Sequence, residues 1–111
     1  MGECKNDSYY LSKIVTDLGF LLEHTKGLTK AQMQKDEVLL DCIMFRLVQI
    51  SENSDRLTDE FKARYSDVSW RAIKGLRNRI VHDYGTVDIS IIFDTVAGDI
   101  PTLYDILVGL V

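Results

Sequence analysis

Apolar residues at three- and four-residue spacings place the strongest constraint on how this chain folds. Between positions 11 and 22 they recur with the period of one helix face: Leu11, Ile14, Val15, Leu18, Leu21 and Leu22. Asp7 or Ser8 is expected to cap this helix and Gly27 to end it. The segment therefore predicts an amphipathic helix that packs on a core.

A second helix is expected to start at Asp36 or Glu37, after a short turn capped by Thr29. It is apolar nearly all round, with Val38, Leu39, Leu40, Cys42, Ile43, Met44, Phe45, Leu47, Val48 and Ile50. Such a helix is either central or has one face on its own bundle and another on a partner chain. We favour the partner chain.

Three further helices are predicted along the rest of the chain. Thr58, Phe61 and Tyr65 indicate a short third helix, and a serine or aspartate within 66–69 is expected to cap the fourth. The fourth carries an apolar stripe, which we interpret as core, and ends at Tyr84-Gly85: Trp70, Ile73, Leu76 and Ile80. Asp88 opens a fifth helix, which Pro101 must kink or split.

The fold class that follows is all-α, an antiparallel bundle of about four or five helices in a single domain, residues 1–111. The β-branched run at 87–92 resembles a strand, but the spacing beyond it is helical and other strand candidates are absent. With 46% hydrophobic residues, the chain is large enough to bury roughly two-thirds of its unfolded surface without disulfides or metals.

Three features of the sequence indicate the cellular compartment: the N-terminus, the length of the apolar runs and the cysteines. The N-terminus lacks the order of a secretory signal, and no apolar run approaches the roughly 20 residues of a membrane helix. Cys4 and Cys42 show no metal-type spacing, and Cys42 is expected to be a buried free thiol. We expect a soluble, cytoplasmic protein without a membrane partner.

Basic charge is concentrated in one segment of an acidic chain. The formal net charge is -4, yet the stretch from Val68 to His82 holds four basic residues and no carboxylate: Arg71, Lys74, Arg77 and Arg79. The acidic balance argues against nonspecific coating of nucleic acid, and DNA is not expected as a partner. Any contact with nucleic acid must be local, with Arg71, Lys74 and Arg79 as candidate RNA-binding residues.

Arg77 and His82 in this stretch suggest a reaction. A guanidinium donates to two phosphoryl oxygens at once, and an imidazole takes or gives a proton near neutral pH. Together they fit cleavage of RNA without a metal or cofactor, in which a base activates the ribose 2'-hydroxyl and a cation stabilises the phosphate. Asn78 lies one turn before His82, so its amide is expected to orient the imidazole.

One regular helix cannot aim both residues at one phosphate, because Arg77 and His82 would point about 140° apart. Either the helix loosens before Gly85, or a second subunit completes the site across a two-fold axis. A dimer would also supply the second proton carrier that acid–base cleavage uses. The non-catalytic alternative is a solvated helix end that is stabilised by its basic residues. His24 we interpret as a surface residue.

The ordered set of motifs resembles the HepT-like branch of the HEPN superfamily. It comprises Arg77-Asn78-x3-His82-x-Tyr84, then Val87-Asp88 and Asp99-Ile100-Pro101-x-Leu103, with Ile50-Ser51-Glu52 and Arg56-Leu57 upstream. The resemblance implies a helical homodimer that acts as a metal-independent endoribonuclease, the toxin of a prokaryotic toxin–antitoxin pair. It implies that Arg77 and His82 are catalytic. Tyr84 is then the residue to which a cognate MNT-type nucleotidyltransferase antitoxin adds AMP.

Two positions depart from the family pattern, and one further residue is carried over from it. Ser51 replaces a common glycine, and Gly85 stands where a bulky aromatic residue is frequent. Glu52 matches a family position near the site and is taken as a supporting residue with Asn78. The alternative function is a noncatalytic helical subunit, in which the basic stretch binds a nucleotide or docks the nucleotidyltransferase.

Overall fold

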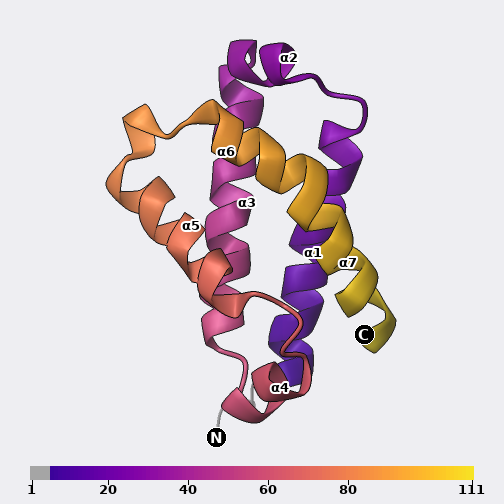
Figure 1. Ribbon diagram of the computed structural model, residues 1–111. Helices are drawn as coiled ribbons and strands as arrows, with labels where there is room; N and C mark the ends of the chain where they lie inside the picture. Colours follow the sequence, from indigo (N-terminus) through magenta and orange to yellow (C-terminus); the bar gives the residue numbers. More distant parts are fainter. Residues whose placement is uncertain (1–5) are drawn as a thin grey trace, which may run out of the picture.

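The computed structural model describes residues 6–111, which contain helices and no strand. Helices α1 (Asp7–Thr25), α3 (Glu37–Asp55) and α5 (Trp70–His82), with α6 (Ile89–Asp94) and α7 (Ile100–Leu107), form the arms of an antiparallel bundle (Figure 1). The short helices α2 (Lys30–Lys35) and α4 (Asp59–Arg64) lie at its two ends. The predicted all-α class and antiparallel bundle are confirmed. The single-domain assignment stays a prediction, and Cys4 lies outside the described residues.

The start of α1 differs from the prediction by one residue. Asn6 is the N-cap, and its side-chain oxygen accepts a hydrogen bond from the Tyr9 amide at 3.1 Å. Asp7 instead accepts hydrogen bonds from the Thr58 amide at 2.8 Å and the Thr58 hydroxyl at 2.7 Å. Asp7 therefore ties α1 to the start of α4, and a contact so distant in sequence was not visible in local spacing.

The connection between α1 and α3 follows the predicted signals. Gly27 adopts a φ of 71°, a backbone conformation that glycine tolerates without strain. Thr29 caps α2 in a capping box with Gln32, and Asp36 caps α3 by accepting a hydrogen bond from the Leu39 amide. These caps turn the chain between two antiparallel arms.

Helix α3 is the central arm, and its two faces differ. Its inner face is buried against α1, α5 and the core, and includes Ile43, Met44, Leu47 and Ile50. Its outer face exposes Val38 and Phe45, which are 76% and 58% accessible. Cys42 is also exposed, so the prediction of a buried thiol is wrong. The helical period places Cys42 one turn after Val38, on the outer side of the helix.

Helix α5 packs on α3 through a narrow apolar stripe. Ile80 is buried, whereas Trp70, Ile73 and Leu76 are half-buried against the core, as the predicted stripe requires. The Trp70 indole donates hydrogen bonds to the carbonyls of Lys62 and Tyr65, both at 3.2 Å. Ser69 holds the N-cap position, as predicted, but its side chain makes no capping hydrogen bond.

The last arm is split where Pro101 requires it. Between α6 and α7 lies η2 (Thr95–Asp99), a π-helical turn, in which the Ile100 amide donates to the Thr95 carbonyl. Proline has no amide hydrogen to donate and cannot continue a regular helical ladder. Short 3₁₀ turns η1 (Tyr84–Thr86) and η3 (Val108–Leu110) complete the described chain. Within residues 6–111, no helix has both the length and the apolar character needed to span a membrane.

Candidate functional site

Arg77 is held in place from two directions on the exposed side of α5. Its Nε donates a hydrogen bond to Glu52 Oε1 on α3 at 2.8 Å, and its Nη1 donates to Asn78 Oδ1 at 3.1 Å. The Arg77 side chain is 33% accessible. Among the described side chains, which do not include that of Tyr84, the guanidinium makes no further hydrogen bond. The arrangement offers an oriented cation to an anionic ligand.

Glu52 is the contribution of α3 to this site. Its carboxylate is half-exposed and forms an ion pair with Arg77 across the α3–α5 contact. The carboxylate reduces the net positive charge at the site, but it also fixes one edge of the guanidinium plane. The structure thus brings together Arg77, Asn78 and Glu52.

His82 is not part of that hydrogen-bonded group. It is the last residue of α5 and is exposed, and its imidazole makes no hydrogen bond within the described part of the chain. The Asn78 side-chain oxygen accepts a hydrogen bond from Arg77, and no hydrogen bond joins Asn78 to His82 among the described side chains. Orientation of the imidazole by Asn78 stays a prediction.

The helix stays regular between the two motif residues. Helix α5 runs unbroken from Trp70 to His82, and the 3₁₀ turn η1 begins only afterwards. Arg77 and His82 therefore keep the wide angular separation of an ideal helix. The chain leaves the α-helix at Asp83 and Tyr84, before Gly85 but after His82, so this loosening does not change the angle between Arg77 and His82. Completion of the site by a second subunit stays a prediction.

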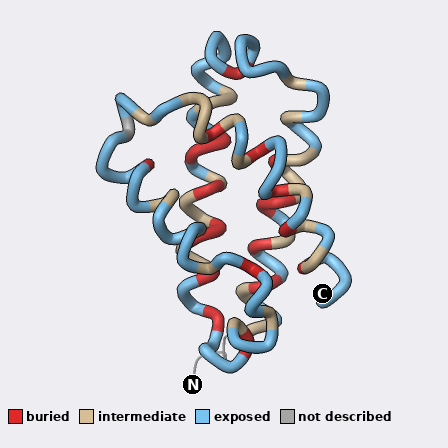
Figure 2. Tube along the Cα trace, in the orientation of Figure 1, coloured by how far each residue is buried: buried red, intermediate tan, exposed pale blue. Residues whose placement is uncertain are grey.

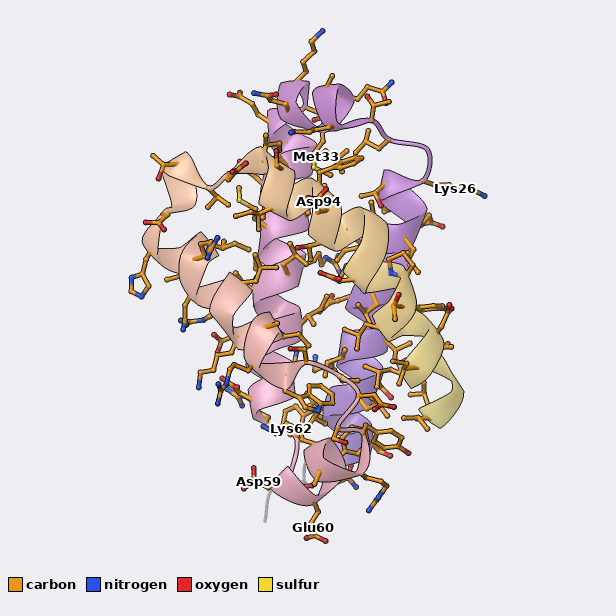
Figure 3. All side chains as sticks on the ribbon, viewed as in Figure 1. Lys26, Met33, Asp59, Glu60, Lys62 and Asp94 are labelled. Carbon is orange, nitrogen blue, oxygen red and sulfur yellow. The ribbon has the colours of Figure 1, made fainter. Side chains whose placement is uncertain are left out.

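The remaining basic residues extend along the outer side of α5. Arg71, Lys74 and Arg79 are all exposed, and Lys74 lies 3.8 Å from the Asp55 carboxylate. Acidic side chains occur elsewhere on the surface, for example Asp59 and Glu60, which point outward from α4 in Figure 3. The structure thus exposes all three candidate RNA-binding cations on one helix.

The Tyr84 side chain and possible metal ligands complete the account of the predicted site. The backbone of Tyr84 belongs to η1, but its side chain lies outside the described part of the structure. No group of three or more His, Cys, Asp or Glu residues positioned to hold a metal ion occurs among residues 6–111.

An exposed apolar surface adjoins the Arg77–Glu52 pair and was not predicted residue by residue. We call it the outer α3–α5 face: Val38 and Phe45 on α3, and Val81 on α5, which is 46% accessible. Val81 lies one turn from Arg77, and Phe45 lies two turns from Glu52. Helices α3 and α5 are antiparallel and are joined by the Arg77–Glu52 ion pair. Phe45 and Val81 therefore both lie on the same side of this ion pair along the helix axes. The sequence signal for the outer α3–α5 face was the apolar pattern of α3, which extends nearly all round that helix.

Comparison with known proteins identifies the relatives of this chain. A sequence model of the family described as "Ribonuclease HepT-like" matches residues 14–109. The chain is 35% identical to "Putative RNase TTE0752" of Caldanaerobacter subterraneus subsp. tengcongensis, over 85% of this chain and 84% of that protein. It is 27% identical to "Probable ribonuclease HepT" of Thermococcus cleftensis, over 85% of this chain and 86% of that protein.

A third relative, "Gamma-glutamylcyclotransferase and putative RNase MJ0434" of Methanocaldococcus jannaschii, is 27% identical over 89% of this chain but only 45% of its own length. No solved structure matches the chain significantly. The family match spans nearly the whole bundle, including Glu52 and the segment from Arg77 to Tyr84. On this ground the chain belongs to the HepT-like ribonuclease family.

Proposed function

We propose that this chain is a metal-independent endoribonuclease and the toxin of a prokaryotic toxin–antitoxin pair. The observation that carries the proposal is the oriented guanidinium of Arg77, which Glu52 and Asn78 hold by hydrogen bonds on a partly exposed side of α5. A fixed planar cation is suited to a phosphodiester whose charge increases in the transition state. The membership in a ribonuclease family supports the same assignment.

In the proposed reaction, Arg77 binds a nonbridging oxygen of the scissile phosphate. A neutral His82 takes the proton of the ribose 2'-hydroxyl, and the 2'-oxygen attacks phosphorus. The bond from phosphorus to the 5'-oxygen of the next nucleotide breaks, and a protonated histidine gives its proton to that oxygen. The products are a 2',3'-cyclic phosphate and a free 5'-hydroxyl.

A homodimer is part of the proposal because acid–base cleavage uses two proton carriers and α5 contains a single histidine, His82. His24 on α1 stacks on the Phe20 ring and belongs to a different element, so His82 is the proton carrier of the motif helix. Two copies that pair through the outer α3–α5 face would bury Val38, Phe45 and Val81. A two-fold axis there would bring the second His82 toward the first site.

Regulation by an antitoxin is the second part of the proposal. An MNT-type nucleotidyltransferase would transfer AMP to the Tyr84 hydroxyl, which follows His82 by two residues. Added phosphate would place negative charge near Arg77 and compete with the RNA phosphate for that cation. The proposed location is the cytoplasm, where RNA and such a partner occur together.

The alternative is a noncatalytic subunit that binds a nucleotide or a nucleotidyltransferase through the basic side of α5. The exposed cations Arg71, Lys74 and Arg79 would serve either function. Docking alone requires charge but no titrating group, so His82 distinguishes the two proposals.

The test is cleavage of mixed cellular RNA in EDTA by the purified protein and by the His82→Ala variant, with analysis of the fragment ends. We expect cleavage by the parent with 2',3'-cyclic phosphate ends, and a loss of about 10²- to 10⁴-fold in the variant. Mass spectrometry must first show that Tyr84 of the purified protein carries no AMP.

The matched control is His24→Ala, which removes the other histidine of the chain from an exposed position on α1. It should cleave at the parental rate, and circular dichroism should show equal helicity in all three proteins. Cleavage by His82→Ala at the parental rate would contradict the catalytic assignment. No cleavage by the unmodified parent would favour the noncatalytic subunit.

A further inference from the structure

A long groove lies between α5 and the α6–η2–α7 arm, away from the Arg77–Glu52 pair. Its volume is about 630 Å³, and Leu47 and Ile50 of α3 form its floor. Figure 1 shows the backbone of α3 between these two arms. Aliphatic side chains from three elements line most of it: Leu47, Ile50, Ile73, Leu76, Ile100 and Leu103. Grooves of this size and character hold small organic ligands or rings.

Most of the polar side chains that line the groove can accept hydrogen bonds, and Arg79 is the one cation among them. Asp67 and Asp99 contribute carboxylates, and Ser69, Thr95 and Thr102 contribute hydroxyls. The two threonine hydroxyls already donate to backbone carbonyls within their helices, whereas Ser69 makes no capping hydrogen bond. A carboxylate only accepts hydrogen bonds, so the groove presents chiefly acceptors over an apolar floor. It fits a flat, mostly apolar ligand that carries N–H donors.

Arg79 is the exception, and it connects the groove to the proposed active site. It lines the groove from α5, is exposed, and has no ion-pair partner among residues 6–111. Between Arg77 and Arg79, the outer side of α5 presents Asn78 and His82, and also Arg71. Arg77 and Arg79 lie on opposite flanks of α5, a helix about 11 Å wide. An RNA strand that is bound through one phosphate at Arg77 must therefore run roughly 20 Å around the outer side of α5 to reach Arg79.

We propose that this groove binds an unpaired nucleobase of the RNA substrate, specifically a base that carries an exocyclic amine. The proposal rests on the proposed ribonuclease function and adds a site for substrate selection. Arg79 would hold the phosphate of that nucleotide at the edge of the groove. The base would lie on the aliphatic floor and donate its amine to Asp99 or Asp67.

The choice of base follows from donors and acceptors. Adenine, cytosine and guanine each carry an amino group on the edge that pairs with another base, whereas uracil carries only one ring N–H there. Because base pairing occupies the same edge, the nucleotide in the groove must be unpaired. The groove therefore selects single-stranded RNA with an amine-bearing base a few nucleotides from the cleaved bond.

The test compares cleavage sites in a randomised single-stranded RNA library for the parent, Asp99→Ala and Ala72→Phe. Ala72 is exposed and lines the groove, so phenylalanine there fills the groove without touching Arg77 or His82. We expect the parent to disfavour uracil at one fixed distance from the cut. Asp99→Ala should weaken that preference about tenfold, the effect of one hydrogen bond to a charged group.

Ala72→Phe should abolish the preference and raise KM about tenfold, while the fragment ends remain 2',3'-cyclic phosphates. The matched control is Ala63→Phe, an exposed alanine on α4 that does not line the groove, which should cleave as the parent does. If the parent shows no base preference at any position, or if Ala72→Phe retains it, the base site is wrong while the ribonuclease assignment stands.

A direct binding measurement separates this inference from the proposed function. Titration of the full chain with 5'-AMP, 5'-CMP and 5'-UMP should shift the backbone amide resonances of Ala72, Ile73 and Thr102, with 5'-UMP the weakest. Loss of RNA cleavage with these shifts intact would overturn only the ribonuclease proposal. Absent shifts, or a change in oligomeric mass caused by Ala72→Phe, would identify the groove as a protein interface and overturn the base site.

Discussion

Helices α1 and α5 are both amphipathic arms on the same central helix, but they use their residues differently. Helix α1 buries Leu11, Ile14, Leu18 and Leu21, and even Asp17 is nearly enclosed, 2.7 Å from Arg46. Helix α5 fully buries only Ile80. Figure 2 shows the same contrast, with buried stretches along α1 and α3 and an exposed outer α5. Helix α1 stabilises the bundle, whereas α5 presents chemical groups on its surface.

The largest effect should follow removal of the Arg77 guanidinium. Arg77→Ala is expected to slow RNA cleavage about 10²- to 10³-fold, or about 3 to 4 kcal/mol, because the phosphate loses its oriented cation. Arg77→Lys should recover little, since an ammonium cannot bind Glu52, Asn78 and a phosphate in the same planar arrangement. Single-turnover rates measure this. Arg64→Ala on α4 is the control, and equal losses in both variants would contradict a specific site.

The next largest effect concerns stability and compares a leucine from each helix. Leu18→Ala on α1 removes a side chain with 0% exposure and should lower the free energy of unfolding by about 3 kcal/mol. Leu76→Ala on α5 should lower the free energy of unfolding by about 1 kcal/mol, because the Leu76 side chain is only half-buried. Urea unfolding followed by circular dichroism gives both values. Equal costs would break the contrast between the two helices.

A charge on the outer α3–α5 face should test whether a second subunit covers it. Phe45→Glu is expected to weaken dimerisation at least about tenfold, since two like charges would meet at a two-fold interface. Light scattering at micromolar concentration would show a shift from dimer to monomer, with a parallel loss of cleavage. Val108→Glu, an exposed apolar residue on another arm, is the control. A monomeric parent would remove the two-histidine site.

The smallest effect compares two helix starts. The Thr58 hydroxyl accepts from the Phe61 amide and donates to Asp7, so Thr58→Ala should cost about 1 kcal/mol of stability. Ser69 makes no capping hydrogen bond at the start of α5, so Ser69→Ala should change stability by less than about 0.3 kcal/mol. Thermal unfolding of both variants provides the measurement. A costly Ser69→Ala would show that α5 is capped in solution.

Local sequence determined most of the helices, because their signals act over three or four residues. The periodic leucines of α1, the caps at Thr29, Asp36 and Asp88, and the break at Pro101 all appear where spacing and side-chain chemistry predicted them. The basic stretch and its Arg-x4-His spacing were equally visible, and with the ordered motifs they indicated the family that the comparisons show.

Only the tertiary structure decided which side chains meet and which faces remain open. The Arg77–Glu52 contact joins residues 25 positions apart, and the Asp7–Thr58 contact joins residues 51 apart. Periodicity gave α3 an apolar surface on every side, but only packing showed that Phe45 and Cys42 lie outside the bundle. The physical reason is the distance along the chain over which each kind of interaction acts. Helix formation depends on neighbours along the chain, whereas burial and side-chain pairing depend on the arms against which a helix packs.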